Sequence, residues 1–229
     1  MYQNIMFDLD GTVTDSGRAI ITSVEYALSH FGYEDQPREK LETFIGPSLY
    51  DSFVREYGFN DEDCNKAVDL YRKVYEEGRM YDVDVYDGIP ELFKELKDQG
   101  KEVLIITSKP LRFTEKILSH IGLDKYIDHQ VGPDLIDHSS DKKRLIEKAV
   151  EKYGLNKDEC IMIGDTKYDI LGACQAGVDS IGVTYGYGKI EELIAAEATY
   201  LAKDVDNIRA HLFLKPYIML NQQHSRLIL

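Results

Sequence analysis

The chain has 229 residues and carries 41 acidic against 27 basic side chains, a formal net charge of -14 at pH 7. This acidity argues against nucleic acid or an anionic membrane as the principal partner, because both require clustered Lys and Arg. A small anionic substrate is compatible with the charge, since it needs only a local positive pocket. The length allows one large domain, or a main domain together with a smaller one.

Three sparse cysteines, Cys64, Cys160 and Cys174, form no CxxC pair and no close cluster with histidine. This usage is typical of reduced thiols, and it argues against a disulfide framework or a zinc site. The opening MYQNIMFD leaves no room for a signal peptide before the first expected strand, and the apolar runs are too short to span a bilayer. We therefore expect a cytoplasmic protein, a monomer or weak homodimer, with no membrane partner.

Four continuous apolar runs predict strands that are buried on both faces, as in a parallel sheet. Helical patterns separate these runs, with proline or glycine at several of their ends. Strands that alternate with helices predict a doubly wound, Rossmann-like α/β fold. The expected strands are Ile5–Leu9, Glu102–Thr107, Cys160–Gly164 and a segment starting at Asp179, and the expected helices are Pro90–Gln99, Leu111–His120, Lys142–Tyr153 and Asp169–Ala176.

One stretch, between the first strand and Asp87, breaks this alternation. It holds roughly four helical patterns and no convincing strand; Ile20, Val24 and Leu28, for example, repeat at the spacing of an amphipathic helix. An all-helical block inside an α/β domain indicates an insertion. We predict a catalytic core of residues 1–16 and 82–214, a helical cap of residues 17–81 and a C-terminal tail of residues 215–229.

Polar residues stand at the carboxyl ends of three expected strands. The first strand runs into DLDGT, the second into TSKP and the third into GDTKYD. Each segment alone could be an ordinary turn, because Asp, Gly and Ser are common turn residues. In an open parallel sheet, however, ligands bind beyond the carboxyl ends of the strands. Three such ends together indicate a polar site at one rim of the sheet.

The residue types at this rim suit phosphoryl transfer. A carboxylate can attack phosphorus and form an aspartyl-phosphate, which splits hydrolysis into two displacements. A cation must then lie between the two negative groups, and oxygen ligands without Cys or His favour Mg²⁺. Hydroxyl, amide and ammonium donors can bind the phosphoryl oxygens. A second carboxylate two residues beyond the nucleophile lies on the same side of an extended segment and can transfer the proton.

Several segments resemble the haloacid dehalogenase-like (HAD) hydrolase superfamily. FDLDGTVTDS, IITSKP and MIGDTKYDILGACQAGV look like its first, second and fourth motifs, and the helical insertion resembles its α-helical cap. DGIPELFKELKDQG and FIGPSLYDSF further resemble its phosphoglycolate-phosphatase-like branch. The resemblance extends from Asn4 to about Leu212, nearly the whole chain. It implies a phosphatase that uses Mg²⁺ and acts on a small phosphorylated metabolite.

The resemblance also implies a role for each matching aspartate. Asp8 would be the nucleophile, and Asp10 would be the general acid and base. Asp8, the backbone carbonyl of Asp10, and Asp165 would hold Mg²⁺. Asp169 would be a further carboxylate of the metal site, either bound directly or through water.

The third motif of the superfamily is a single lysine at the start of a helix. The segment SSDKKRLIEKAV offers two candidates, Lys142 and Lys143. The spacing to the apolar pair Leu145–Ile146 matches the branch pattern and favours Lys142. The Lys-Pro that many relatives carry at this point is absent.

Substrate contacts are expected from two further segments. Thr107 and Ser108 would bind the phosphate, and Lys109 beside them is a candidate for the substrate, although it could equally be a surface residue. Gly46 and Pro47 begin the segment GPSL, whose counterpart in relatives faces the active site. The same segment could also be an interhelical turn whose serine caps the next helix. The tyrosines of the helical insertion are expected to serve packing.

Three functions are therefore compared. A phosphatase is favoured, with phosphoglycolate, a sugar phosphate or a 5′-nucleotide as the substrate. A sugar phosphomutase is the alternative, because such enzymes keep both leading aspartates, but their cap carries an Arg-containing substrate loop that FIGPSLYDSF does not resemble. A non-catalytic binding scaffold is disfavoured because Asp8, Asp10 and Asp165 are all present.

Overall fold

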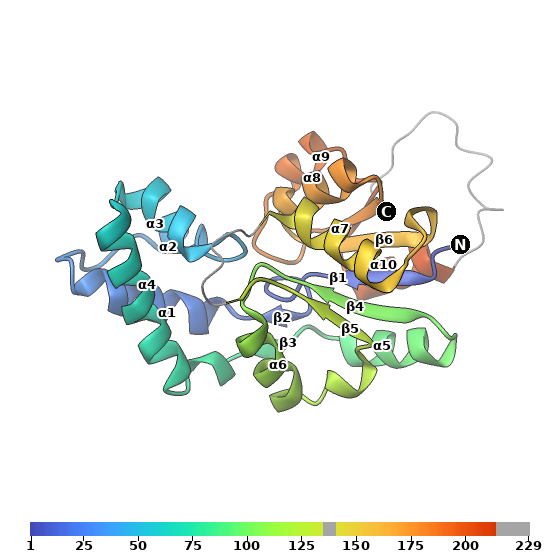
Figure 1. Ribbon diagram of the computed structural model, residues 1–229, viewed down its shortest axis with the longest axis horizontal. Coiled ribbons are helices and arrows are strands. Elements are labelled where there is room, and N and C mark those ends of the chain that lie inside the picture. The colour runs from blue at the N-terminus through green and yellow to red at the C-terminus, as the bar shows by residue number, and fades with distance from the viewer. Residues whose placement is uncertain (135–140, 214–229) are drawn as a thin grey trace.

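The computed structural model describes residues 1–134 and 141–213, which form a sheet-centred core and a helical block beside it (Figure 1). The core sheet has six parallel strands in the order β5-β4-β1-β6-β7-β8. Their bounds are β1 Asn4–Phe7, β4 Glu102–Ile106, β5 His129–Val131, β6 Cys160–Gly164, β7 Asp179–Val183 and β8 Tyr200–Ala202.

Helices cover both faces of this sheet, as a doubly wound fold requires. Successive side chains of a strand point to opposite faces, so Ile5 and Phe7 of β1 pack on one side while Met6 packs on the other. The first face is covered by α5 (Ile89–Asp98), α6 (Leu111–His120) and α10 (Val205–Phe213), and the second by α7 (Lys142–Tyr153) and α8 (Lys167–Ala176), with α9 (Ile190–Ala195) against α8. The predicted fold class is confirmed.

The helical block has a hydrophobic core of its own. It contains α1 (Gly17–Ser29), α2 (Arg38–Glu42), α3 (Leu49–Tyr57), α4 (Asp61–Glu76) and the short 3-10 helix η1 (Arg79–Tyr81). Two further 3-10 turns, η2 (Asp124–Tyr126) and η3 (Lys157–Glu159), belong to the sheet-centred core. Phe113 and Ile117 of α6 pack into the block's cluster, so the two parts share an apolar contact as well as their chain connections.

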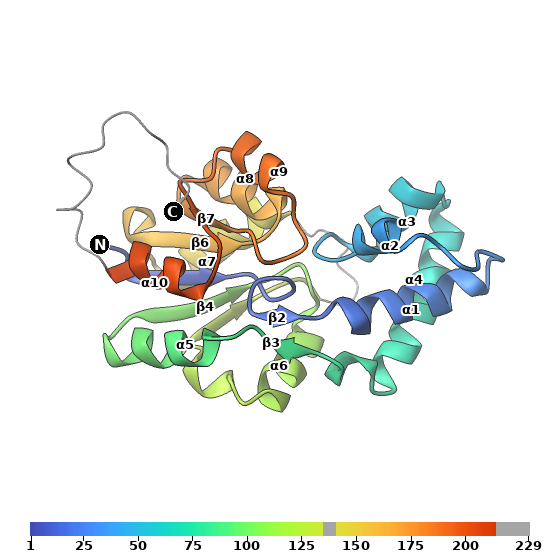
Figure 2. The ribbon, with the colours of Figure 1, turned by 180° about the vertical axis from the view of Figure 1, so that it is seen from behind.

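A small antiparallel pair joins the two parts. β2 (Thr14–Asp15) precedes the block and β3 (Asp84–Val85) follows it, and Thr14 is opposite Val85 in their register. Figure 2 shows the pair between the main sheet and α1. The sequence prediction of no strand in this stretch was therefore wrong. Strands of two residues are too short to carry an alternating pattern, and their pairing depends on bringing both ends of the insertion together.

Other differences lie at the edges of the sheet. β5 and β8 were not predicted, because each has three residues and no continuous buried apolar run. β1 ends at Phe7 and not at the predicted Leu9, although the Asp8 amide still donates to the Ile163 carbonyl of β6 at 2.9 Å. The predicted tail of residues 215–229 lies outside the described residues. In the described part of the chain, no helix combines the length and apolar character needed to cross a membrane.

Candidate active site

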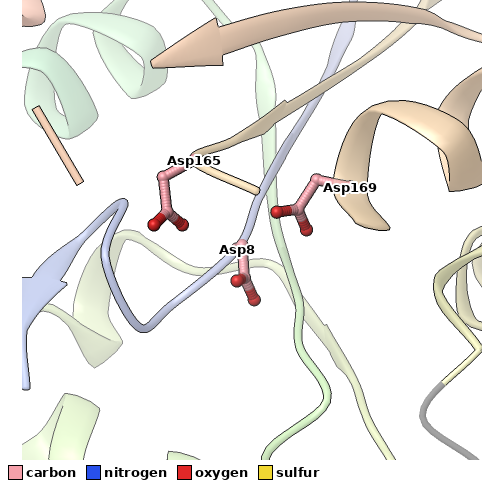
Figure 3. A group of neighbouring side chains, drawn as sticks. All are labelled: Asp8, Asp165 and Asp169. Carbon is pink, nitrogen blue, oxygen red and sulfur yellow. The ribbon is translucent and has the colours of Figure 1, made fainter. Parts of the chain in front are cut away.

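Three aspartates meet at the carboxyl edge of the sheet. Asp8 directly follows β1, Asp165 follows the neighbouring strand β6, and Asp169 lies in the first turn of α8 (Figure 3). Each contributes one carboxylate oxygen to a group whose atoms all lie within 4.8 Å of one another. All three side chains are buried. These three side chains therefore lie together at the edge of the sheet where the strand ends predicted a polar site.

Hydrogen bonds hold two of these carboxylates in place. Asp165 Oδ1 accepts from the Thr12 hydroxyl at 3.2 Å, and its Oδ2 accepts from the Tyr187 amide at 2.8 Å. Asp169 Oδ2 accepts from both the amide and the hydroxyl of Thr166, at 3.1 and 2.8 Å, in a capping box that starts α8. A local capping box thus orients Asp169, whereas contacts from two distant segments orient Asp165.

Lys142 lies among the carboxylates. Its Nζ is 2.9 Å from Asp8 Oδ1 and 2.7 Å from Asp169 Oδ1, and it donates to the carbonyl of Ile106 at 3.0 Å. The lysine opens α7, where the preceding residue caps the helix. Lys143 instead pairs with the partly exposed Glu147, one turn further along α7. Of the two candidate lysines, the fold brings Lys142 to the site.

Burial perturbs the charges of this group. Desolvation raises the pKa of Asp8 to about 7; Lys142 opposes this shift and Asp169 adds to it. Desolvation and the charges of Asp169 and Asp8 raise the pKa of Asp165 to about 8. Desolvation alone would lower the pKa of Lys142, but the attraction of Asp169 and Asp8 outweighs it and the pKa lies above its ordinary value. One ammonium therefore does not neutralise three buried carboxylates.

The donor set fits a hard divalent cation. Asp8 Oδ1 and Asp169 Oδ1 are both buried, and both depend on the single ammonium of Lys142. A cation beside these oxygens would compensate the excess negative charge. Carboxylate oxygens without nearby Cys or His match Mg²⁺ and not Zn²⁺. The residues present thus fit the predicted ion.

Asp10 faces a second lysine. Lys109 Nζ lies 3.0 Å from Asp10 Oδ2 and donates to the hydroxyl of Tyr75 at 2.6 Å. Lys109 is 9% exposed, so it is not a surface residue. Tyr75 belongs to α4 and packs edge-on against Phe113, as expected for packing, but its hydroxyl also binds a residue beside the site. Sequence patterns gave no signal for this second contact.

The predicted phosphate contacts follow β4. β1 and β4 are neighbours in register, with Phe7 opposite Ile105, so Thr107 comes just beyond the strand end beside Asp8. Thr107 is buried, and its hydroxyl accepts from the amide of Lys109 at 3.1 Å. This bond orders the turn that carries Ser108.

Two adjoining cavities lie between the sheet edge and the helical block. One is bordered by Asp8, Asp169 and Lys142, and the other by Asp10, Lys109 and apolar side chains of the block. Residues that border both cavities are Gly46, Pro47 and Ser108. The loop of the helical block therefore meets the turn at Ser108 where the two cavities join.

Both interpretations of the segment GPSL apply. Gly46 has φ +100°, and a Cβ there would lie 3.3 Å from the Thr166 methyl group, so this loop faces the core. Ser48 meanwhile caps α3, since its hydroxyl accepts from the amide of Asp51 at 3.1 Å. The capping bond shapes the loop, and the loop approaches the site.

The sequence interpretation missed the loop after β7. Tyr187 binds Asp165 through its amide, and Tyr185 donates its hydroxyl to the carbonyl of Thr12 at 2.9 Å. The only local signal is the alternation of Tyr and Gly in TYGYG.

Comparison with known proteins agrees with this carboxylate-rich α/β enzyme site. The model of the family described as "Haloacid dehalogenase-like hydrolase" matches residues 5–183. A 5′-nucleotidase from Pseudomonas aeruginosa is 38% identical over 208 residues, which cover 91% of this chain and 94% of that protein. Phosphoglycolate phosphatase 1 from the same species is 29% identical over 212 residues, covering 90% and 76%.

A crystal structure described as a predicted phosphatase from Clostridium acetobutylicum has a TM-score of 0.89 and 40% identity, and covers 93% of this chain and 98% of that one. The chain therefore belongs to the haloacid dehalogenase-like hydrolases. The family predicted from the motifs is confirmed.

Proposed function

We propose that this chain, a phosphatase of the haloacid dehalogenase-like family, hydrolyses a small phosphomonoester with Mg²⁺ through an aspartyl-phosphate on Asp8. The observation that carries the proposal is the placement of Asp8 between Lys142 and the carboxylates of Asp165 and Asp169. A carboxylate nucleophile needs positive charge around it before an anionic phosphate can approach. Lys142 supplies part of that charge, and the three carboxylates would hold the ion that supplies the rest.

The chain's own residues would then divide the reaction as follows. An Asp8 oxygen attacks phosphorus, the bond to the leaving oxygen breaks, and Asp10 delivers a proton to that oxygen. Asp10 next takes a proton from water as this water attacks phosphorus, which releases inorganic phosphate and restores Asp8. Thr107 and the turn at Ser108 donate to the phosphoryl oxygens. Mg²⁺, held by Asp8, the Asp10 carbonyl and Asp165, with Asp169 direct or through water, would neutralise charge on the phosphate.

The leaving group would occupy the cavity beside Asp10 and Lys109. Its lining from the helical block combines apolar side chains with Arg72 and tyrosines, which suits an organic leaving group, and the loop at Gly46 and Pro47 closes one side of it. A 5′-nucleotide and phosphoglycolate are both compatible with this site, and the names of the two Pseudomonas relatives support both. The partner is thus a small phosphorylated metabolite.

Phosphate release from a panel of phosphomonoesters tests the proposal. Mg²⁺ should support release and excess EDTA should abolish it. Asp8→Asn should be inactive with every substrate. Asp158→Asn is the matched control. Asp158 is exposed and precedes β6, so it lies at the amino ends of the strands, away from the site at their carboxyl ends. Activity that persists in EDTA would contradict the metal assignment, and a rearranged sugar phosphate without phosphate release would indicate a mutase.

A further inference from the structure

Tyr187 contacts two parts of the molecule that are distant in sequence. Its amide donates to Asp165 Oδ2 at 2.8 Å. Its hydroxyl donates to Asp15 Oδ1 and accepts from the amide of Gly17 at 2.7 Å. Asp15 ends β2 and Gly17 begins α1, so these two residues mark the point where the chain leaves the core for the helical block. A single residue thus links the carboxylate site, through its backbone amide, to that connection, through its hydroxyl.

The start of α1 depends on this contact. The N-cap residue Ser16 makes no side-chain cap bond, and its buried hydroxyl has no partner among the described residues. The first helical amide is bound instead by Tyr187 and, at 3.3 Å, by Asp15. A Cβ on Gly17 would overlap the Tyr187 hydroxyl, so glycine is needed for this approach. The helix therefore begins on a tertiary contact and not on its own cap.

The other end of Tyr187 is packed equally closely. Gly186 and Gly188 flank it, and a Cβ on either residue would overlap atoms of Asp165. A Cβ on Gly11 would also overlap the Asp165 carboxylate. Asp165 is consequently packed tightly against this loop. A displacement of the loop must displace the carboxylate or break the amide bond to it.

We propose that Tyr187 is a positioning residue that couples the start of α1, and with it the helical block, to the Asp165 carboxylate. The cation part of this proposal rests on the proposed function, which assigns Asp165 to the metal site. Coupling of two sites is reciprocal. A shift of the block at Asp15–Gly17 would alter cation affinity, and cation binding would stabilise the first turn of α1.

The test uses the full chain with Tyr187→Phe, which keeps the ring and the backbone amide but removes both hydroxyl contacts. Amide hydrogen exchange over residues 14–20 is measured without metal, and Mg²⁺ binding is measured by titration calorimetry. We expect exchange in this segment to accelerate and the Mg²⁺ dissociation constant to rise, each by about tenfold, as loss of a hydrogen bond allows. Exchange in β4 should not change.

Two further variants separate coupling from general destabilisation. Tyr2→Phe removes the same kind of bond, a phenol donating to the Asp179 carboxylate at 2.6 Å, at the far edge of the sheet, and should change neither quantity. Asp15→Ala removes the partner from an exposed position and should reproduce the effect of Tyr187→Phe.

Faster exchange in Tyr187→Phe with an unchanged Mg²⁺ dissociation constant would overturn the coupling. The Mg²⁺ titration is independent of turnover. A wild-type protein that binds Mg²⁺ but releases no phosphate from any ester would overturn the proposed function and not this coupling.

Discussion

Lys109 Nζ lies 3.0 Å from Asp10 Oδ2, in a buried contact beside the second cavity. The sequence interpretation made Lys109 a candidate for substrate binding. In the structure its ammonium forms an ion pair with Asp10 and donates a hydrogen bond to the hydroxyl of Tyr75. This geometry favours a role in orienting the proposed general acid.

Lys109→Met tests that role. The substitution keeps an unbranched side chain but removes the ion pair, so the proposed proton transfer should suffer. General acid–base catalysis typically accelerates a reaction by about 10²–10⁴-fold. Because Asp10 itself remains, we expect a smaller fall in kcat, roughly 10–100-fold, and a still smaller change in KM. Steady-state kinetics check the split. A higher KM with unchanged kcat would instead indicate that Lys109 binds the substrate.

Tyr75→Phe should produce a weaker form of the same defect. The ring and its contact with Phe113 stay, and only the hydroxyl that accepts from Lys109 is lost. We expect kcat to fall about fivefold to tenfold, as for one hydrogen bond. Tyr33→Phe is the control: Tyr33 packs edge-on against Tyr57 in the same helical block and borders neither of the two cavities. An equal loss in both variants would point to packing alone.

Substitutions of Asp8 and Asp10 should affect turnover differently. Asp8→Asn should abolish turnover, because an amide cannot form the acyl-phosphate. Asp10→Asn should keep the nucleophile and slow proton transfer by about 10²–10⁴-fold. Since activation of water also needs Asp10, the phosphorylated protein should accumulate, which intact-mass spectrometry detects. Near-wild-type turnover of Asp8→Asn would exclude covalent catalysis at this residue.

The metal-free protein should lose stability as pH rises. Desolvation raises the pKa of Asp165 to about 8 and that of Asp8 to about 7, from an ordinary value of about 4. The folded state thus binds more protons than the unfolded state within this window, and the free energy of unfolding falls as pH increases from about 4 to 8. Thermal unfolding in EDTA measures this fall.

Asp165→Asn supplies the comparison, since its amide has no proton to lose. Its melting temperature relative to that of the wild type should increase with pH across the same window. Mg²⁺ should stabilise the wild type above pH 7 and have less effect on the variant. A constant difference between the two proteins at every pH would contradict the perturbed carboxyl groups.

The loop at Gly46 should govern substrate choice. Its φ of +100° and its approach to Thr166 mean that Gly46→Ala strains the loop and displaces it from the core. We expect the ranking of phosphomonoesters by kcat/KM to change while the Mg²⁺ dissociation constant stays within about twofold. Gly32→Ala is the control, because Gly32 also has positive φ but nothing lies near its Cβ position. Equal effects of both variants would assign the change to backbone strain.

The sequence by itself determined the doubly wound core, the inserted helices and the aspartates at the rim. These follow from local patterns: buried strands read as apolar runs, and ligand-binding residues stand directly after them. Asp8 and Asp165 were accessible to this reasoning because each stands directly after an apolar run that forms a strand. Short edge strands and the β2–β3 pair were not, because two or three residues carry no periodicity.

Only the tertiary structure decided which lysine reaches which carboxylate. Lys142 and Lys143 are adjacent, and the phase of α7 against the sheet turns one of them to Asp8. The bonds of Tyr75 to Lys109 and of Tyr187 to Asp15 join residues from separate elements, 34 and 172 positions apart. No local pattern encodes such contacts, because packing the helical block against the sheet creates them.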